Sequence, residues 1–219
     1  DASHELKTPL AILSANLGLL EDSLGDNPFL HSAQSQITRL DRLIKHLVEL
    51  ARTEETVKEA SVSTFSLSDV VQASVDAFQP LAESAGCTLS ADIAPDAEMR
   101  GVRDNLFRLC SILLDNAVKY CDPGGTIALS LARRGRSLSL SVSNPCAGLD
   151  PAQLPRYFDR FYRADSSRAR STGGYGIGLS TAKAIVTRHR GRISNRYSGG
   201  VITFSVILPS GGRKGGAVP

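Results

Sequence analysis

The chain has 219 residues, of which 42% are hydrophobic and 21% are charged, and its formal net charge is +3. This composition is that of an ordinary globular protein and excludes the disordered and fibrous classes. The net charge is too small to indicate nucleic-acid binding, so we expect a mixed-sign, solvated surface and no nucleic-acid partner. The length allows one large domain or two modest ones.

The four cysteines show neither metal-ligand spacing nor the density of a disulfide framework, which predicts reduced thiols in a cytosolic compartment. The sequence contains no signal-peptide pattern and no apolar run near the roughly 20 residues that cross a bilayer. The first helical pattern starts without an N-cap signal. We therefore expect the chain to be a piece of a longer protein.

Residues 1–55 are predicted to form a helical hairpin. Its first helix carries apolar residues at alternating steps of four and three, which is a heptad seam: Leu6, Leu10, Leu13, Leu17, Leu20 and Leu24. Gly25-Asp26-Asn27-Pro28 should break this helix, and a second apolar series runs from Leu30 to Ala51. The stripes are too wide for one hairpin to bury, so two chains should pair into a four-helix bundle. The segment thus predicts a homodimer.

Residues 56–210 are predicted to form an α+β domain, after a polar connector at Arg52–Ser61. The expected strands are 62–65, 88–93, 126–132, 137–143, 192–197 and 201–208, and the expected helices are 66–85, 104–120 and 177–189. Asp104 is the expected N-cap of the second helix, and Gly191 is the expected left-handed glycine after the third, beside a structural His189. Antiparallel connections predict a sandwich with helices on one face. Residues 211–219 are predicted to be a disordered tail.

His4 is the first candidate for chemistry. With Leu6 at heptad position d, His4 and Thr8 lie on one outward face, four residues apart. The neighbouring Glu5 is placed to accept a proton from one imidazole nitrogen, which leaves the other nitrogen more nucleophilic. Pro9 should bend the helix just after this face. A solvated surface histidine is the alternative interpretation.

Two further stretches indicate phosphate chemistry. Asn116 lies in a predicted helix with Lys119 and Tyr120 on its face; an amide oxygen can bind Mg²⁺, and a lysine can neutralise phosphates. The alternative is a polar helix edge. Glycines at 174, 176 and 178 run straight into another helix, where backbone N–H groups can approach an anion. Such a glycine pattern alone is weak evidence.

The stretch His4-Glu5-Leu6-Lys7-Thr8-Pro9-Leu10 resembles the phospho-acceptor box of sensor histidine kinases of two-component systems. The resemblance covers residues 1 to about 208. It implies a dimeric four-helix bundle followed by a Bergerat-type α/β sandwich that binds ATP. It also implies that His4 is phosphorylated, that Glu5 is the adjacent acid/base, and that Thr8 helps to orient water for dephosphorylation of the partner response regulator.

The same resemblance implies an ATP and Mg²⁺ site, with Asn116 as the metal ligand. The nucleotide-contacting positions that it implies are Asn116, Lys119, Tyr120, Asn144, Gly148, Arg163, Gly174, Gly176, Gly178 and Leu179. The aromatic stretch 157–163 resembles the family's F box, which anchors a lid predicted here at about 164–172.

Three residues depart from the family pattern. Ile112 stands where the family often has an asparagine and where related ATP-hydrolysing enzymes have a glutamate base, so plain ATP hydrolysis is disfavoured. Asn144 replaces an aspartate that accepts a hydrogen bond from the adenine amino group, and its oxygen lacks charge assistance. Cys146 adds a Cβ to the loop that precedes Gly148.

The sequence therefore predicts the cytoplasmic core of a bacterial sensor histidine kinase whose parent protein is membrane-anchored. Residues 1–55 would be the dimerisation and phosphotransfer domain, and residues 56–210 the catalytic ATP-binding domain. ATP would phosphorylate His4, and the phosphoryl group would pass to an aspartate of a response regulator, with phosphatase activity toward that regulator. The alternatives are a scaffold with a degenerate nucleotide site, a phosphatase-biased dimer, and an ATP-hydrolysing clamp.

Overall fold

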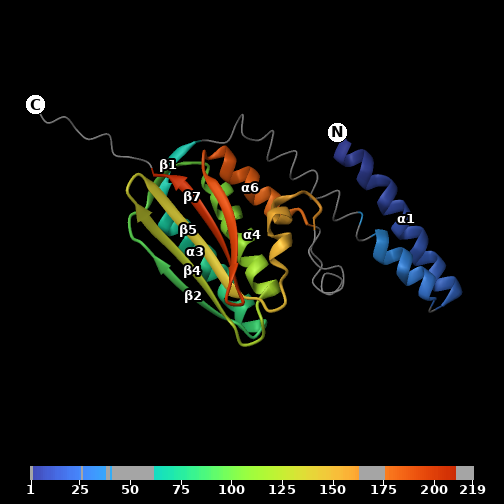
Figure 1. Cartoon of the computed structure of the whole chain (residues 1–219). Helices are drawn as coiled ribbons and strands as arrows, with labels where there is room; N and C mark the ends of the chain where they lie inside the picture. The colour runs from blue at the N-terminus through green and yellow to red at the C-terminus, as the bar shows by residue number, and fades with distance from the viewer. Residues whose placement is uncertain (1, 26, 38–39, 41–61, 163–175, 211–219) are drawn as a thin grey trace, which may run out of the picture. The chain divides into compact units, whose positions relative to one another are not determined.

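The computed structural model describes residues 2–25, 27–37, 40, 62–162 and 176–210 (Figure 1). The chain divides into two compact units, Asp1–Ala60 and Ser61–Pro219, and each is described by itself. The predicted connector, lid and tail lie outside the described residues. No helix in the described part of the chain combines the length and the apolar character that a bilayer crossing needs.

The first unit begins with α1 (Ala2–Leu24), which ends at the predicted break. Gly25 adopts a φ of 68°, and its N–H donates to the Glu21 carbonyl oxygen at 2.9 Å. Glycine adopts this left-handed conformation without strain. Residues 28–37 are helical again, and Asn27 caps them because its Oδ1 accepts the Phe29 N–H at 2.9 Å.

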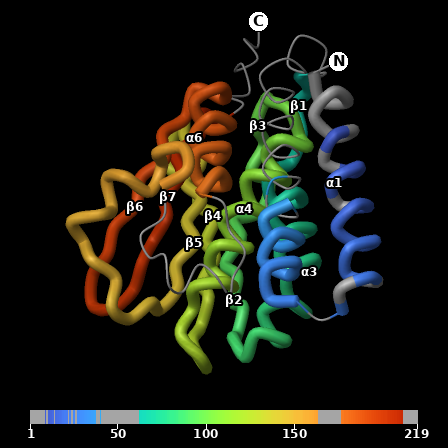
Figure 2. Tube along the Cα trace, turned by 90° about the vertical axis from the view of Figure 1, so that its right-hand side faces the viewer, coloured from blue at the N-terminus to red at the C-terminus, as the bar shows by residue number. Residues whose placement is uncertain are grey.

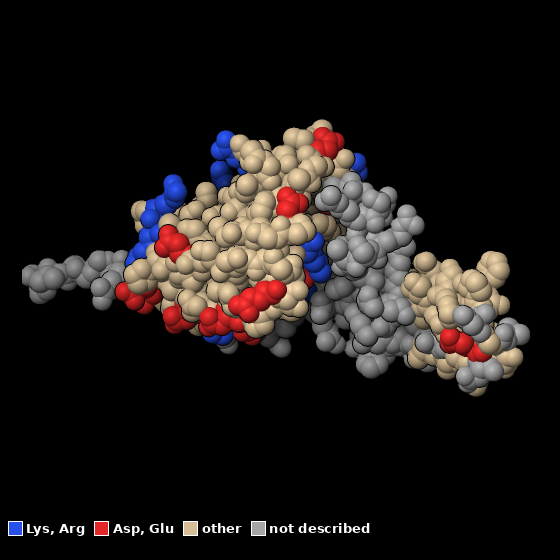
Figure 3. All heavy atoms as spheres, turned by 90° about the horizontal axis from the view of Figure 1, so that it is seen from below, with Lys and Arg blue, Asp and Glu red and all other residues tan. Residues whose placement is uncertain are grey.

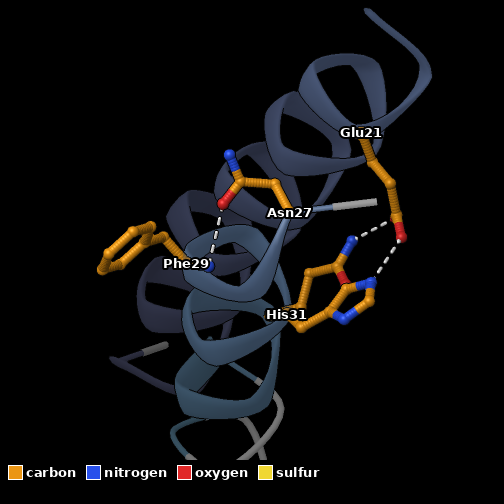
Figure 4. Close-up of polar contacts among 5 residues, drawn as sticks. Glu21, Asn27, Phe29 and His31 are labelled. Carbon is orange, nitrogen blue, oxygen red and sulfur yellow. Dashed lines mark hydrogen bonds and ion pairs between the residues drawn. The ribbon is translucent and has the colours of Figure 1, made fainter. Parts of the chain in front are cut away.

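The Glu21 carboxylate connects the two helical segments of this unit (Figure 4). One of its oxygens accepts a hydrogen bond from Gln34 Nε2 at 2.6 Å, and the other lies 3.3 Å from His31 Nε2. These contacts hold the hairpin together at its turn. The predicted continuation of the second helix to Ala51 lies outside the described residues after residue 40.

The second unit is built on a five-stranded sheet in the order β2-β4-β5-β7-β6. The strands are β2 (Thr88–Ile93), β4 (Thr126–Arg134), β5 (Ser137–Pro145), β6 (Arg192–Ser198) and β7 (Val201–Pro209). One face is covered by α3 (Leu67–Ser84), α4 (Arg103–Tyr120) and α6 (Gly178–Arg188), as Figures 1 and 2 show. The short strands β1 (Ser63–Ser66) and β3 (Glu98–Gly101) form a second sheet, and η2 (Pro151–Phe158) is a 3-10 helix. The predicted α+β sandwich is confirmed.

Strict alternation along β5 and β7 builds the centre of the core. Leu138, Leu140 and Val142 point to the helices and pair across the sheet with Leu208, Val206 and Phe204, all of them buried. The next inward position of β5 is Asn144, which is only 1% exposed and lies opposite Ile202. A polar side chain thus continues an apolar row.

Three details of this unit differ from the prediction. β2 pairs parallel to β4, because the chain crosses back through β3 and α4 between the two strands. β3 was not predicted, because four residues with a single apolar side chain, that of Met99, show no alternation. α4 begins after Val102, and Asp104 lies in its first turn, where a carboxylate still interacts favourably with the helix N-terminus.

The end of α6 corrects one further prediction. The left-handed residue is Arg190, with a φ of 56°, and not Gly191. The Arg190 N–H donates to Thr187 O at 3.0 Å and the Gly191 N–H donates to Val186 O at 2.9 Å, the bond pair of a Schellman motif. Gly191 is needed for space, because a Cβ there would lie 2.5 Å from the Ile207 carbonyl oxygen of β7.

None of the four cysteines forms a disulfide bond. Burial raises the pKa of the Cys110 thiol to about 12, and burial together with the neighbouring Cys87 does the same for Cys121. Both thiols therefore stay protonated at neutral pH and behave as small apolar side chains.

The surface in Figure 3 carries charges of both signs, with acidic side chains gathered along one rim.

His189 connects the end of α6 to the start of α4. Its ring is buried; Nε2 accepts the Val102 N–H at 3.1 Å, and Nδ1 lies 2.8 Å from the Ile185 carbonyl oxygen. Since Nε2 accepts, the proton of the neutral ring is on Nδ1, which donates to Ile185. Desolvation lowers the pKa of His189 and so favours this neutral form. The predicted structural role agrees with these contacts.

We expect His189→Leu to lower the free energy of unfolding by about 2 kcal/mol at pH 7, because the Val102 N–H loses its acceptor. The wild-type chain should also lose stability as the pH falls below about 6.5, since the unfolded histidine then binds a proton that the folded one does not. The variant should lack that part of the pH dependence. Urea unfolding followed by tyrosine fluorescence measures both effects, because all five tyrosines lie in the second unit. Equal pH slopes for the two proteins would contradict this account.

Candidate active site

His4, Glu5 and Thr8 all lie on α1, within two turns of one another, and Pro9 lies inside the same helix. The helical backbone therefore keeps the predicted spacing of four residues between His4 and Thr8. The side chains of these three residues lie outside the described part of the structure, so their outward orientation stays a prediction.

The last turns of α4 carry Asn116, Lys119 and Tyr120. Asn116 is half-buried, and Tyr120 packs against the core. The Lys119 ammonium forms an ion pair with Asp115, with a distance of 2.6 Å between Nζ and Oδ2. Both side chains are partly exposed, so this pair contributes little stability, and Lys119 can exchange Asp115 for another anion.

Asn144 has one of its two polar atoms occupied. Its Nδ2 donates to the Pro145 carbonyl oxygen at 3.0 Å. Its Oδ1 receives no hydrogen bond from the described residues, although the side chain is buried. A buried acceptor without a donor is costly, so this atom is suited to a ligand that brings an N–H group.

The loop after β5 accommodates the departures that the sequence shows. Cys146 is buried; its N–H donates to Gly200 O at 2.8 Å, and its carbonyl oxygen accepts the Tyr197 hydroxyl at 3.0 Å. Gly148 has a φ of 76° and open space around it, so its requirement for glycine is conformational. Cys146 has no positive φ, and the backbone therefore accepts its Cβ.

The glycine turn leads directly into α6, whose first residue is Gly178. The first helical hydrogen bond is donated by the Thr181 N–H to Ile177 O at 2.9 Å, and the side chain of the N-cap residue, Ile177, makes no capping hydrogen bond. The preceding N–H groups, including that of Leu179, thus form an anion-favouring helix terminus. A Cβ on Gly178 would lie 3.5 Å from Ile112 of α4, so these two elements are neighbours.

Gly176 lies against the end of the aromatic stretch. Its carbonyl oxygen accepts the Phe161 N–H at 2.9 Å, and Phe161 itself has a φ of 64°. A Cβ on Gly176 would collide with the Tyr162 carbonyl oxygen. The Tyr162 ring is held by Arg156, 4.3 Å from its centroid, and its hydroxyl donates to Gln153 at 2.9 Å.

Arg163, Gly174 and the predicted lid lie outside the described residues. Among the predicted positions that are described, the structure brings the end of α4 to the end of β5, because the Asp122 N–H donates to Pro145 O at 3.0 Å. Asp122 was not among the predicted site residues, and only its place just after α4 could have indicated it. Burial first, and then the neighbouring Cys146, raise the pKa of Tyr157 to about 12.

No cluster of three or more His, Cys, Asp or Glu side chains in the described part of the chain could hold a metal ion. Asn116, with its amide oxygen near the end of α4, is the predicted protein ligand.

Two family models match the chain. Residues 101–212 match the histidine kinase-, DNA gyrase B- and HSP90-like ATPases, and residues 1–56 match the His Kinase A (phospho-acceptor) domain. The chain belongs to the sensor histidine kinases of two-component systems. The described arrangement of the second unit agrees with this family's ATP-binding fold.

Relatives of this histidine kinase chain include the sensor protein DltS of Streptococcus agalactiae, 34% identical over 97% of this chain and 53% of the relative. The kinase BaeS of Escherichia coli is 32% identical over 95% of this chain and 45% of the relative. The chain thus spans about half the length of the curated relatives that it matches.

Among solved structures, full-length ShkA in complex with AMPPNP has a TM-score of 0.70 at 19% identity. The match covers 95% of this chain and 44% of the ShkA chain. The histidine kinase AdeS of Acinetobacter baumannii has a TM-score of 0.67 at 21% identity, and the match covers 95% of this chain and 98% of the AdeS chain. These similarities support the fold of the histidine kinase core.

Gly176→Ala should destabilise the second unit more than Gly135→Ala does. Both glycines have a positive φ, at which a Cβ costs about 1–2 kcal/mol, but only Gly176 also abuts backbone atoms, those of Tyr162. The Gly135 position is open, so that variant measures the conformational cost alone. Thermal unfolding compares the two, and equal losses would show that the contact at Gly176 is unimportant.

Proposed function

We propose that this chain is the kinase core of its parent protein, with ATP as phosphoryl donor and His4 as acceptor. The observation that carries the proposal is the buried Oδ1 of Asn144, which receives no hydrogen bond from the residues that the structure describes, in a chain that also contains a phospho-acceptor segment. Residues 1–55 would form the dimerisation and phosphotransfer domain, and residues 56–210 the catalytic domain.

The proposed nucleotide site assigns a role to each group. The adenine amino group would donate to Asn144 Oδ1, and the uncapped N–H groups at Gly178 and Leu179 would receive phosphate oxygens. Lys119 would leave Asp115 to neutralise the phosphates. The other proposed contacts are Tyr120, Gly148, Arg163, Gly174 and Gly176. Mg²⁺, bound through Asn116, would neutralise phosphate charge in the transition state.

The proposed reaction is an in-line displacement. A nitrogen of the His4 imidazole attacks the γ-phosphorus of ATP; the new N–P bond forms while the P–O bond to ADP breaks, and ADP leaves. Glu5 accepts the proton that the imidazole loses. Positioning and charge neutralisation supply most of the rate enhancement in such transfers.

We further propose that the active form is a homodimer. Leu13, Leu20 and Leu40 of the predicted seam are 50%, 45% and 48% exposed in the single chain, and a second hairpin would cover them. The phosphoryl group would pass to a response-regulator aspartate, and Thr8 would assist dephosphorylation of that regulator. The whole protein would be anchored in a bacterial cell membrane, with this core on the cytoplasmic side.

A second candidate function is a dimer with a weakened nucleotide site that acts as a scaffold or mainly as a phosphatase. Ile112 favours it, because an apolar side chain packed toward Gly178 cannot accept a proton or bind a metal. The Asp115 carboxylate, which holds Lys119, favours it as well. Neither feature removes the unpartnered Asn144 oxygen or the uncapped start of α6.

Incubation with γ-³²P-labelled ATP and Mg²⁺ tests the kinase proposal. We expect an acid-labile, base-stable label on the wild-type chain and none on His4→Ala. His31→Ala is the matched control, since it removes a histidine of the same hairpin, and it should keep the label. A label that persists in His4→Ala would reject His4 as the acceptor, and absence of ATP binding would favour the scaffold.

Asn144→Leu should weaken ATP binding about tenfold, because the base loses a buried hydrogen bond while the side-chain volume is conserved. Inosine triphosphate carries an oxygen in place of the adenine amino group, and the wild-type chain should bind it more weakly than ATP. The variant should no longer distinguish the two nucleotides. Calorimetric titration provides the dissociation constants, and unchanged discrimination would refute the role of Asn144.

A further inference from the structure

The turn that follows α4 is hydrogen-bonded to the loop that follows β5. The Asp122 N–H donates to Pro145 O at 3.0 Å, and the Asp122 carboxylate accepts the Ala147 N–H at 2.8 Å. One residue thus holds both sides of Cys146. The two segments are also packed closely, because a Cβ on Gly125 would lie 2.5 Å from Pro145 Cγ and 2.7 Å from Cys121 Sγ.

The same loop has two further tethers on its other side. Gly200 O accepts the Cys146 N–H at 2.8 Å, and the Tyr197 hydroxyl donates to Cys146 O at 3.0 Å. Both come from the β6–β7 hairpin. The loop is therefore fixed from two directions, and the Asp122 carboxylate is a side-chain tether on the α4 side.

Pro145 O is the link between Asp122 and the Asn144 amide. This single carbonyl oxygen accepts from the Asp122 N–H at 3.0 Å and from Asn144 Nδ2 at 3.0 Å. The bond from Nδ2 sets which way the amide faces, and so it sets the direction of the unpartnered Oδ1. Any shift of the loop away from Asp122 would move that carbonyl and turn the amide with it.

We propose that Asp122 is a positioning residue for nucleotide binding, which acts by holding the loop at residues 145–147 so that Asn144 Oδ1 faces the base. It touches neither the base nor the phosphates. The inference rests on the nucleotide-binding function proposed above, and it adds a residue that the family pattern did not indicate. A charge-assisted bond to a backbone N–H is stronger than a neutral one, which suits a carboxylate to this task.

The experiment compares Asp122→Ala and Asp122→Asn with the wild-type chain. Asp122→Ala should raise the KM and the dissociation constant for ATP about tenfold while kcat for labelling stays within about twofold. Asp122→Asn keeps an acceptor oxygen for Ala147 and should recover most of the affinity. Asp76→Ala is the matched control, because Asp76 is an exposed carboxylate on α3 that accepts a hydrogen bond from Gln72 of the same helix, and it should change neither constant.

Inorganic triphosphate separates positioning from general damage. It has no base, so its binding should be the same in Asp122→Ala and wild type. The double variant Asp122→Ala, Asn144→Leu should bind ATP no more weakly than Asn144→Leu alone, because both changes act on one contact. Equal loss of ATP and triphosphate binding, or fully additive effects, would overturn the inference.

Normal ATP binding by the wild-type chain and by Asp122→Ala would overturn the inference and leave the proposed function intact. No ATP binding by the wild-type chain would overturn both. Thermal unfolding checks each variant, and Asp122→Ser replaces Asp122→Ala if the alanine variant does not fold. Failure of both to fold, with Asp122→Asn folded, would make the role of Asp122 structural and would also overturn the inference.

Discussion

The Asn144 amide interrupts the apolar, helix-facing side of the sheet, and the cost of burying it constrains the second unit. Leaving one of its polar atoms unsatisfied costs about 1–3 kcal/mol. The paired, fully buried rows of β5 and β7 supply apolar contacts that offset this cost. The Pro145 carbonyl satisfies the amide nitrogen, so the atom left without a partner among the described residues is the oxygen. The direction of that oxygen depends on the Pro145 carbonyl, so the contacts that fix the loop at residues 145–147 also fix the amide.

The periodic parts of the fold were predictable from the sequence because alternation and helical spacing report burial directly. Leu138, Leu140 and Val142 alternate with serines, and the resulting strand has the expected place and direction relative to its hairpin partner. The parallel pairing of β2 with β4 was not predictable in the same way. It depends on how α4 packs, which no local pattern encodes. β3 and η2 are too short for periodicity to distinguish them from loops.

Motifs supplied candidate site residues where the chemistry of a residue type suggests one use, and their roles stay predictions. Asn116, Lys119 and the glycines before α6 were identified from motifs, and the described residues among them lie on the expected elements. Pairwise contacts could not be predicted. The ion pair between Lys119 and Asp115 and the two bonds of Asp122 depend on side-chain and loop geometry. Cys146 adds a Cβ to its loop, and the backbone accommodates it with a negative φ and a buried thiol.

The hydrogen bond between Phe161 and Gly176 joins two points that are far apart along the chain. It fixes the end of the aromatic stretch to the residues that precede α6. Phe161 has a left-handed φ of 64° here, a strained conformation that persists where neighbouring contacts hold the backbone in place. The bond to Gly176 is such a contact, so this junction stores backbone strain beside the start of α6.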